Sequence, residues 1–382
     1  MIFSKSTLFS LALAAARVSA AAVPVASQLS SAITDTAKTL STSWGGLHFS
    51  TPAFVTALSV DWPYPNSVIG YDEDWGGIHD HDPSIVKYNG YYYVFSTHNL
   101  VAMARAPSLY GPWEHLGSVL STDSIIDLEG RNDTWAPDVH QVGDTFYCFY
   151  SVSTFGSQYS AIGLATSKTL QPGSWTDHGA VIESGADKVW PYNTTNAIDP
   201  SLLVEFDKKG AVSAAYLTYG SFWSDIFQIE LNKDLTVPAD AASKAKHLSF
   251  DPNGTNPEEG AYIHKASNGW YYLFVSHGTC CGYSDSLPAP GVEYKVLVGR
   301  SKSASGPYLD KNGVDMVKGG GSVFLGSHGH VYGPGGEGVL VDGSNDIFYY
   351  HYVDTRISLL DADKLLGWNI MKYDSSGWPY LT

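Results

Sequence analysis

Three short strings in the sequence place a carboxylate at the start of a run that has the composition of a β-strand. The strings are His81-Asp82-Pro83-Ser84-Ile85, Asn196-Ala197-Ile198-Asp199-Pro200-Ser201 and Glu258-Glu259-Gly260-Ala261-Tyr262-Ile263, and an aromatic run follows each of them. A repeat folded around a common axis would bring acids at equivalent positions together. Converging carboxylates are what the hydrolysis of a glycosidic bond requires, so the pattern predicts a sugar-cleaving site.

The three acids suit three different roles in that reaction. One carboxylic acid must protonate the leaving oxygen, while an ionised carboxylate activates water on the other face of the sugar. Asp82, which lies beside His81, is the candidate general base. Glu259 has the longer side chain in a glycine-flanked, aromatic segment and is the candidate general acid. Asp199 would be the third charge, which raises the pKa of the acid and orients it, because neighbouring carboxylates cannot all ionise together.

Each acid taken alone has a simpler interpretation. An aspartate before proline is a common turn residue, and Glu259 alone would be a solvated loop acid. Recurrence at the same position of three units favours the catalytic interpretation. Asp138 occupies the same place in Trp135-Ala136-Pro137-Asp138, and we interpret it as a structural acid whose supporting role in the site is left open.

From residue 78 onward the chain consists of short aromatic or β-branched runs bounded by Gly, Pro, Asn and Asp, which predict strands and turns. Aligned with one another, the runs form five units, which begin near Asp82, Pro137, Asp199, Glu259 and Gly336. A period of about 60 residues with three or four strands per unit is typical of a β-propeller. We therefore predict an all-β fold, a five-bladed β-propeller over residues 64–382, in which only residues 239–247 have a helical pattern.

The composition restricts the possible partners. Of the 382 residues, 13% are aromatic and 16% are charged, and the formal net charge is −16. Such a surface repels phosphates, which disfavours nucleic acid as a partner. A neutral polysaccharide suits it better, because the C–H faces of sugars pack on aromatic rings.

The first residues have the pattern of a secretory signal. Lys5 precedes an apolar run over residues 8–16, and Val18-Ser19-Ala20 fits a cleavage site, so residues 1–20 are predicted to be a signal peptide. The apolar run is too short to span a bilayer, and we expect a secreted, extracellular protein without a membrane anchor. Residues 21–63 are an N-terminal extension that either adds a strand to the last blade or hangs free.

Two further features bear on the exported state. Asn132, Asn193 and Asn253 each begin an Asn-x-Thr sequon, which predicts glycosylated surface positions. Cys280 and Cys281 are adjacent, and the sequence leaves open whether they form a vicinal disulfide or two free thiols.

In this order, the strings HDPSI, TWAPD, NAIDPS, YGSFW and EGAYI resemble glycoside hydrolase family 43 and, within it, the endo-1,5-α-L-arabinanases of fungi. The resemblance extends from about residue 64 to the C-terminus. It implies a five-bladed propeller that cleaves internal α-1,5-L-arabinofuranosidic bonds of plant cell-wall arabinan with inversion. Carried over by position, Asp82 matches the general base, Glu259 the general acid and Asp199 the pKa modulator. We expect the enzyme to act as a monomer.

The resemblance also implies where the sugar binds. Asn196 and the run Ser221-Phe222-Trp223 match positions that line the sugar subsites of the family. Trp135 and Trp75 are additional candidate platforms, because an exposed indole offers a flat apolar face to a sugar ring.

One departure from the family concerns a metal. Many bacterial arabinanases read Gly-Pro-Gly-His in the last blade, and that histidine helps to hold a central metal ion. This chain reads Gly333-Pro334-Gly335-Gly336-Glu337, with Gly336 at the position of the histidine. We therefore predict neither a metal nor another cofactor.

Two other functions remain open at this point. An exo-acting arabinofuranosidase or β-xylosidase would use the same propeller, because surface loops decide whether the site is an open groove. A non-catalytic carbohydrate-binding propeller is the alternative outside the enzymes, but it has no use for a trio of proton-transfer groups.

Overall fold

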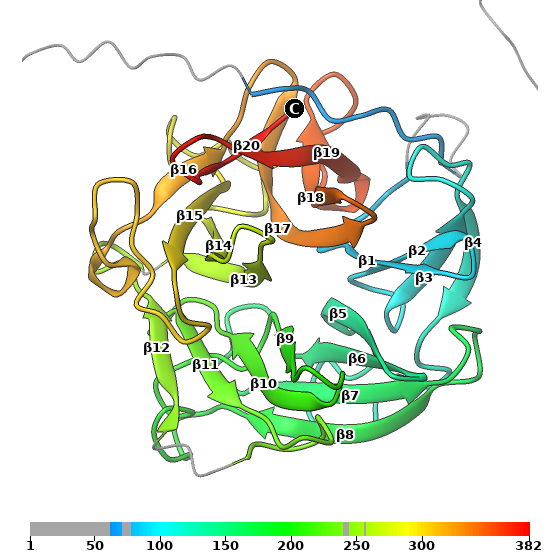
Figure 1. Cartoon of the computed structure of the whole chain (residues 1–382). Helices are drawn as coiled ribbons and strands as arrows, with labels where there is room; N and C mark the ends of the chain where they lie inside the picture. The colour runs from blue at the N-terminus through cyan, green and yellow to red at the C-terminus, as the bar shows by residue number, and fades with distance from the viewer. Residues whose placement is uncertain (1–61, 71–77, 240–243, 256) are drawn as a thin grey trace, which may run out of the picture. The chain divides into compact units, whose positions relative to one another are not determined.

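Five four-stranded antiparallel sheets stand side by side around a central axis (Figure 1). The computed structural model describes residues 62–70, 78–239, 244–255 and 257–382, which all belong to one unit, residues 60–382. The predicted all-β, five-bladed propeller is confirmed. Each blade is a continuous piece of chain, and its strands follow chain order.

The strands are β1 (Ser84–Tyr88), β2 (Tyr91–Ser96), β3 (Ala102–Ala106) and β4 (Glu114–Ser118) in blade 1; β5 (Trp135–Val142), β6 (Thr145–Val152), β7 (Ala161–Ser167) and β8 (Thr176–Glu183) in blade 2; β9 (Ser201–Phe206), β10 (Val212–Tyr219), β11 (Ile226–Glu230) and β12 (Lys246–Ser249) in blade 3; β13 (Glu258–Lys265), β14 (Tyr271–His277), β15 (Lys295–Ser301) and β16 (Ser322–Leu325) in blade 4; and β17 (Val331–Asp342), β18 (Asn345–Asp354), β19 (Leu365–Tyr373) and β20 (Pro379–Leu381) in blade 5. Two short 3-10 helices, η3 (Met316–Lys318) and η4 (Asp361–Asp363), lie in the connections.

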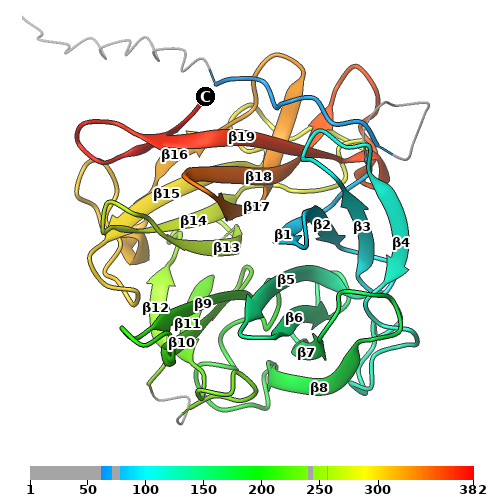
Figure 2. The same ribbon diagram turned by 45° about the vertical axis from the view of Figure 1, so that its right-hand side comes forward.

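The first strand of each blade lies nearest the axis, and the fourth lies at the outside (Figures 1 and 2). Neighbouring blades are held together by apolar side chains, and each of five core clusters spans one boundary between two blades. Phe95 of β2 and Phe146 of β6, for example, are fully buried in the cluster between blades 1 and 2. This packing explains the aromatic second strand of each predicted unit, because that strand is covered on both faces.

The ring closes where blade 5 meets blade 1, and residues 62–70 run across this seam. The backbone N–H of Asn66 donates to the carbonyl of Trp368 in β19, and that of Ile69 donates to the carbonyl of Tyr110 after β3. On the inner side of the seam, the N–H of Leu366 donates to the carbonyl of Ile78. The described residues 62–70 add no strand to blade 5, and residues 1–61, with the predicted signal peptide, lie outside the described residues.

Two expectations about local structure need correction. Residues 246–247 belong to β12 rather than to a helix, because His247 pairs with Phe227 of the neighbouring strand and stacks on its ring; residues 240–243 lie outside the described part of the chain. The fifth unit begins at Val331, before Gly336, because β17 continues through two irregularities in its register with β18. No helix among the described residues is long and apolar enough to cross a membrane.

Candidate active site

The three predicted acids line one cavity of about 760 Å³. Asp82 and Asp199 lie just before β1 and β9, and Glu259 is the second residue of β13, so all three occupy the same end of an inner strand. We call this space the large cavity; its wall also includes His81, Thr97, Trp135, Asn196, Ser221, Tyr294, Cys280, Cys281 and Asp361. The convergence that the repeat predicts is therefore confirmed.

The chain bends sharply at each of these acids. Asp82 and Asp199 have φ angles of 53° and 55°, and Gly260, directly after Glu259, has a φ of 58°. Aspartate is one of the few residues other than glycine that tolerate this left-handed region. Strained backbone of this kind occurs at functional sites, where the surrounding structure holds it in place.

Asp82 is surrounded by groups that favour its ionised form. The Thr97 hydroxyl donates to Oδ2 of Asp82 at 2.7 Å, and the backbone N–H of Asp82 donates to Nδ1 of His351 at 3.0 Å. Nε2 of His81 lies 3.7 Å from Oδ1 of Asp82. Burial alone would raise the pKa of Asp82, but His81, His351 and Thr97 together hold that pKa below its usual range. Asp82 is thus ionised at neutral pH, as a general base must be.

Glu259 has the opposite character. The Ser221 hydroxyl donates to Oε2 of Glu259 at 2.7 Å, and the Tyr294 hydroxyl donates to Oε1 at 2.9 Å. Burial raises the pKa of Glu259, and the negative charge of Asp82 raises it further, which outweighs the two hydrogen bonds. A carboxyl group that keeps its proton towards neutral pH is suited to general acid catalysis.

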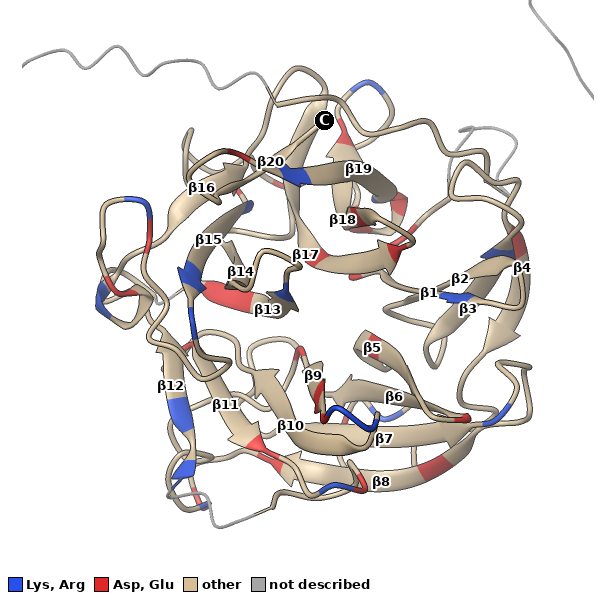
Figure 3. Cartoon of the chain, viewed as in Figure 1, with Lys and Arg blue, Asp and Glu red and all other residues tan. Residues whose placement is uncertain are grey.

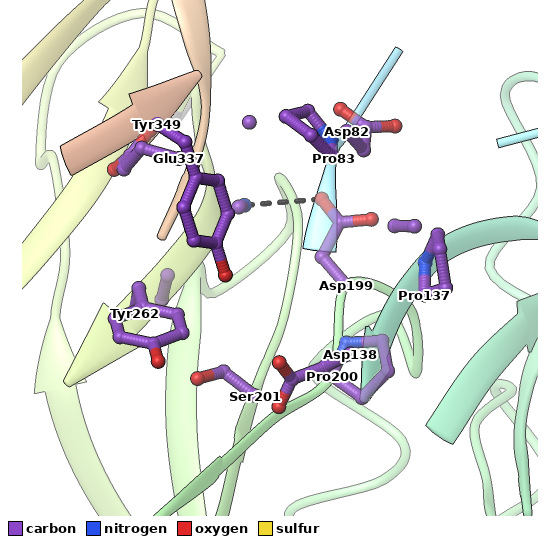
Figure 4. A pocket seen from close by; sticks show the side chains of 14 residues that line it. Asp82, Pro83, Pro137, Asp138, Asp199, Pro200, Ser201, Tyr262, Glu337 and Tyr349 are labelled. Atoms are coloured by element: carbon purple, nitrogen blue, oxygen red, sulfur yellow. Dashed lines mark hydrogen bonds between the residues drawn. The ribbon is translucent and has the colours of Figure 1, made fainter. Parts of the chain in front are cut away.

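Asp199 is connected directly to the segment that carries Glu259. The backbone N–H of Gly260 donates to Oδ2 of Asp199 at 3.0 Å, as the dashed line in Figure 4 shows. Burial, followed by the charges of Glu259 and Asp82, raises the pKa of Asp199 well above its usual range. This hydrogen bond and this mutual repulsion are what a residue needs in order to orient a neighbouring acid and raise its pKa.

The residues predicted to bind sugar all line the large cavity, namely Asn196, Ser221, Phe222, Trp223 and Trp135. Asn196 is buried, and its Oδ1 has no hydrogen-bond partner in the described part of the chain. Trp223 is 37% exposed. Trp75 lies outside the described residues. The binding roles of these side chains remain predictions.

Asp138 lies in a second, smaller space on the axis, the axial cavity, which has a volume of about 40 Å³ and is also lined by Asp82, Asp199 and Glu337 (Figure 4). Oδ2 of Asp138 accepts a hydrogen bond from the N–H of Leu202 at 2.6 Å, and both carboxylate oxygens contact Nε2 of His140. The bond from Leu202 joins blade 2 to blade 3, and the contacts together favour the structural interpretation of Asp138. Acidic positions recur on β5, β9, β13 and β17 around the central opening (Figure 3).

Glu258, the neighbour of the candidate acid, lines neither cavity. It is only 1% exposed, and burial raises its pKa to about 8. Of the two adjacent glutamates, Glu259 is therefore the one placed to reach a substrate in the large cavity.

Sequence reasoning assigned no role at these acids to four residues: Thr97, Tyr294, His351 and Lys364. The repeat could have indicated Thr97, because the residue after the second strand of a blade returns to the mouth of the propeller. Tyr294, directly before β15, and His351 of β18 belong to the general aromatic composition of the chain and carry no separate signal. Nothing in the pattern points to Lys364, which lies in the connection between β18 and β19.

The described residues contain one group of three side chains close enough to share a metal ion: His81, Asp82 and His351. Its members do not fit such an ion. Nδ1 of His351 already accepts the hydrogen bond from the Asp82 N–H, and Nε2 of His81 lies 3.1 Å from Nζ of Lys364. Metal ligation needs the free lone pair of a neutral imidazole, and an ammonium at this distance would also repel the cation.

Gly336 explains why the histidine of the bacterial pattern has no place here. A Cβ atom at this position would lie 2.5 Å from Oδ1 of Asp82 and 2.6 Å from Nδ1 of His351, and the φ of Gly336 is +58°. The space that a side chain at position 336 would need is therefore filled by Asp82 and His351.

Cys280 and Cys281 are joined by a disulfide, which decides between the two alternatives left by the sequence. Both residues line the large cavity, in the connection between β14 and β15.

A five-bladed propeller that holds three carboxyl groups of unequal acidity in one cavity has the machinery of a glycoside hydrolase. The sequence pattern of the family described as "Glycosyl hydrolases family 43" matches residues 78–379, and the chain belongs to this family. The resemblance seen in the sequence is confirmed.

Relatives and solved structures of the same kind are similar over most of their length. A protein of Aspergillus flavus named probable arabinan endo-1,5-α-L-arabinosidase A is 50% identical over 306 residues, which are 80% of this chain and 91% of the relative. The crystal structure of an exo-1,5-α-L-arabinanase from a bovine ruminal metagenomic library matches with a TM-score of 0.69 and 33% identity, over 80% of this chain and 97% of that one. The Cellvibrio cellulosa α-L-arabinanase in complex with arabinohexaose matches with a TM-score of 0.68 and 29% identity, over 80% and 96%.

Proposed function

We propose that this protein hydrolyses internal α-1,5-L-arabinofuranosidic bonds of arabinan with inversion of the anomeric configuration. The observation that carries the proposal is the contrast between Asp82 and Glu259 in one cavity. The pKa of Asp82 is lowered and that of Glu259 is raised, so a base and an acid are present together near neutral pH.

In the proposed mechanism, Asp82 removes a proton from a water molecule that attacks the anomeric carbon. Glu259 donates its proton to the leaving oxygen on the opposite side of the scissile bond. Asp199 keeps the Gly260 segment, and with it Glu259, in position through the hydrogen bond to the Gly260 N–H. Ser221 and Tyr294 hold the carboxylate of Glu259 after it has lost its proton.

The choice of arabinan and of endo action is supported by the Aspergillus flavus relative, whose name states both. The metagenomic arabinanase of the same fold is named as exo-acting, so exo action is the second candidate. Incubation of the purified protein with linear 1,5-α-arabinan separates the two. Endo cleavage releases a series of short oligomers at early times, whereas exo cleavage releases one small product while the polymer stays long.

Inversion has its own measurement. Proton NMR of the first turnovers should show the new reducing end with the opposite anomeric configuration from the bond that was cleaved. The retained configuration as first product would contradict the assignment of Asp82 as a base, because a retaining enzyme uses that carboxylate as a nucleophile.

We also propose that the protein is secreted as a glycosylated monomer. The support is the signal-like pattern of residues 1–20 and the exposure of Asn132 and Asn253. Expression of the full chain in a fungal host, followed by peptide mapping and size-exclusion chromatography of the medium, tests the three statements. Protein retained in the cell, or a native N-terminus at residue 1, would contradict secretion.

A further inference from the structure

A buried lysine lies directly behind the wall of the large cavity. Lys364 follows η4, and its side chain is 0% exposed. Nζ lies 3.1 Å from Nε2 of His81, 3.1 Å from the carbonyl oxygen of Cys280, 3.7 Å from Sγ of Cys281 and 3.6 Å from Oδ1 of Asp361. Lysine is almost never fully buried unless it is paired, because removing an ammonium from water is costly.

The contact with Lys364 fixes the ring proton of His81. An ammonium can only donate hydrogen bonds, so Nε2 of His81 accepts one and the ring proton lies on Nδ1. Nδ1 of His351 accepts the Asp82 N–H at 3.0 Å and also lies 3.3 Å from Oδ1 of Asp82. Burial lowers the pKa values of His81 and His351, and the charge of Lys364 lowers both further, against the opposing charge of Asp82. The pKa values of both rings therefore lie below the usual range of histidine.

Lys364 adds a positive charge beside the acids. The titratable side chains that face it come from several elements: His81 and Asp82 before β1, Glu259 of β13, His351 of β18 and Asp361 of η4. Burial lowers the pKa of Lys364, while Asp361, Asp82 and Glu259 raise it. The carboxylates thus favour the charged ammonium, and the ammonium in turn favours an ionised Asp82.

We propose that the ammonium of Lys364 is the resident cation of this active site, a positioning residue that holds His81 against Asp82 and takes the electrostatic place of a metal ion. The inference rests on the proposed function, since it assigns Lys364 to the site formed by Asp82 and Glu259. Three observations agree with a resident ammonium in place of a metal ion. Position 336 has no room for a metal-binding side chain. Nε2 of His81 and Nδ1 of His351 already take part in hydrogen bonds, and Lys364 is buried.

The first test concerns metals and uses the wild-type protein. After dialysis against EDTA, kcat on linear arabinan should stay within about twofold of the starting value, and added Ca²⁺ or Mg²⁺ should not increase it, because the site already holds its cation. Loss of activity on chelation that Ca²⁺ restores would overturn the proposal.

The second test removes the charge. Lys364→Met should lower kcat by about a hundredfold with little change in KM, because a shift of the base by an ångström is enough for such a loss. The alkaline limb of the pH profile should move to higher pH, because the ammonium lowers the pKa of Glu259. Lys364→Arg keeps the charge and should retain more activity than Lys364→Met.

Lys295→Met is the matched control, because Lys295 is partly buried near the same mouth and, among the described residues, donates to the carbonyl of Gly291 and to none of the acids. It should leave kcat and the pH profile unchanged. If Lys364→Met had the same kcat and the same pH profile as the wild type, the proposed role of Lys364 as a positioning residue would be overturned. If Lys364→Met does not fold, a Lys364→Arg variant that is folded but as inactive as a Glu259→Gln variant would overturn it as well, whereas retained activity would support it.

A third readout does not depend on the substrate. In NMR titrations, the His81 ring should stay neutral to lower pH in the wild type than in Lys364→Met, because the ammonium lowers the pKa of His81. If the pKa of His81 were the same in both proteins, Lys364 would not act on His81 as a charged group, and the proposal would be overturned. If the wild type cleaves no arabinan at all, the proposed function fails, yet this titration still decides whether Lys364 controls the protonation of His81.

Discussion

Glu259 and Asp82 differ in environment more than in chemistry, and this difference leads to a test by leaving group. Glu259→Gln should lose most activity on arabinan, whose leaving alcohol needs a proton, by about a hundred- to ten-thousand-fold. On an aryl arabinofuranoside with a good leaving group, the loss should be much smaller. Asp82→Asn should abolish both activities, because no other group would activate water. The ratio of the two rates in each variant is the measurement, and equal losses for Glu259→Gln on both substrates would remove it from the acid role.

Tyr294 tests how the acidity of Glu259 is set. Its hydroxyl donates to Oε1 of Glu259 and lowers the pKa of that carboxyl, although burial has the larger, opposite effect. Tyr294→Phe should therefore raise the pKa of Glu259 and move the alkaline limb of kcat to higher pH, with a loss at neutral pH of about tenfold at most. Tyr308→Phe is the control, because that buried hydroxyl donates to the carbonyl of Ala304, outside the site. An alkaline limb that stays in place or moves to lower pH would contradict the assignment.

At the scale of single elements, the shape of β17 decides whether Asp82 has room. Gly336→Ala would place a methyl group 2.5 Å from Oδ1 of Asp82, and we expect a loss of kcat of about a hundredfold. Gly343→Ala, in the turn between β17 and β18, imposes the same kind of backbone strain at φ +63° but meets no atom within 4 Å. Gly343→Ala should lose about 1–2 kcal/mol of stability, because it forces alanine into the left-handed region. Gly336→Ala should lose more, because its methyl group must also displace Asp82 or His351.

The comparison of the two glycine variants separates strain from displacement. Kinetics and urea denaturation of both proteins provide it. If Gly343→Ala lost as much activity as Gly336→Ala, the effect would be general strain in the hairpin, and the close approach to Asp82 would carry no special weight.

The elements themselves were largely predictable, because the five units repeat one pattern and an aromatic second strand is covered on both faces. The acids followed from their shared position in that pattern. The prediction of a helix was wrong at residues 246–247. The alanines and lysines of residues 239–247 favour a helix locally, but His247 pairs with Phe227 of the neighbouring strand. The contacts of His351 with Asp82 and of Lys364 with His81 could not be predicted. They join segments that are far apart in the sequence, and neither residue recurs at an equivalent position of the repeat.

At the scale of the whole molecule, buried carboxyl groups make stability depend on pH. Burial raises the pKa of Glu258 to about 8, that of Glu337 to about 8 and that of Asp225 to about 9. A raised pKa means that the folded state holds the proton more tightly than the unfolded state. Their stabilising contribution is fully present below pH 4 and decreases as the pH rises through the range up to 8–9.

Glu258→Gln should remove part of that slope, because a neutral amide of the same shape does not titrate. We expect the variant to gain about 1–3 kcal/mol over the wild type at pH 9 relative to its difference at pH 5. Urea denaturation at several pH values measures this, with the exposed Glu129→Gln as control. Parallel curves for wild type and Glu258→Gln would show that Glu258 ionises as easily in the folded protein as in the unfolded one.

The seam between blade 5 and blade 1 has a consequence for how the enzyme would fail. The carbonyl of Lys364 accepts the N–H of Asp80, and the N–H of Leu366 donates to the carbonyl of Ile78, so the wall of the catalytic site is built from both sides of the joint. Each blade has its own hydrogen-bonded sheet and would survive a small parting of the ring. Asp82 and His351, however, come from opposite sides and would lose contact at once. Mild heating or a protease cut near residues 62–70 should therefore abolish the activity first. The circular dichroism spectrum should at that point still be that of an intact β protein.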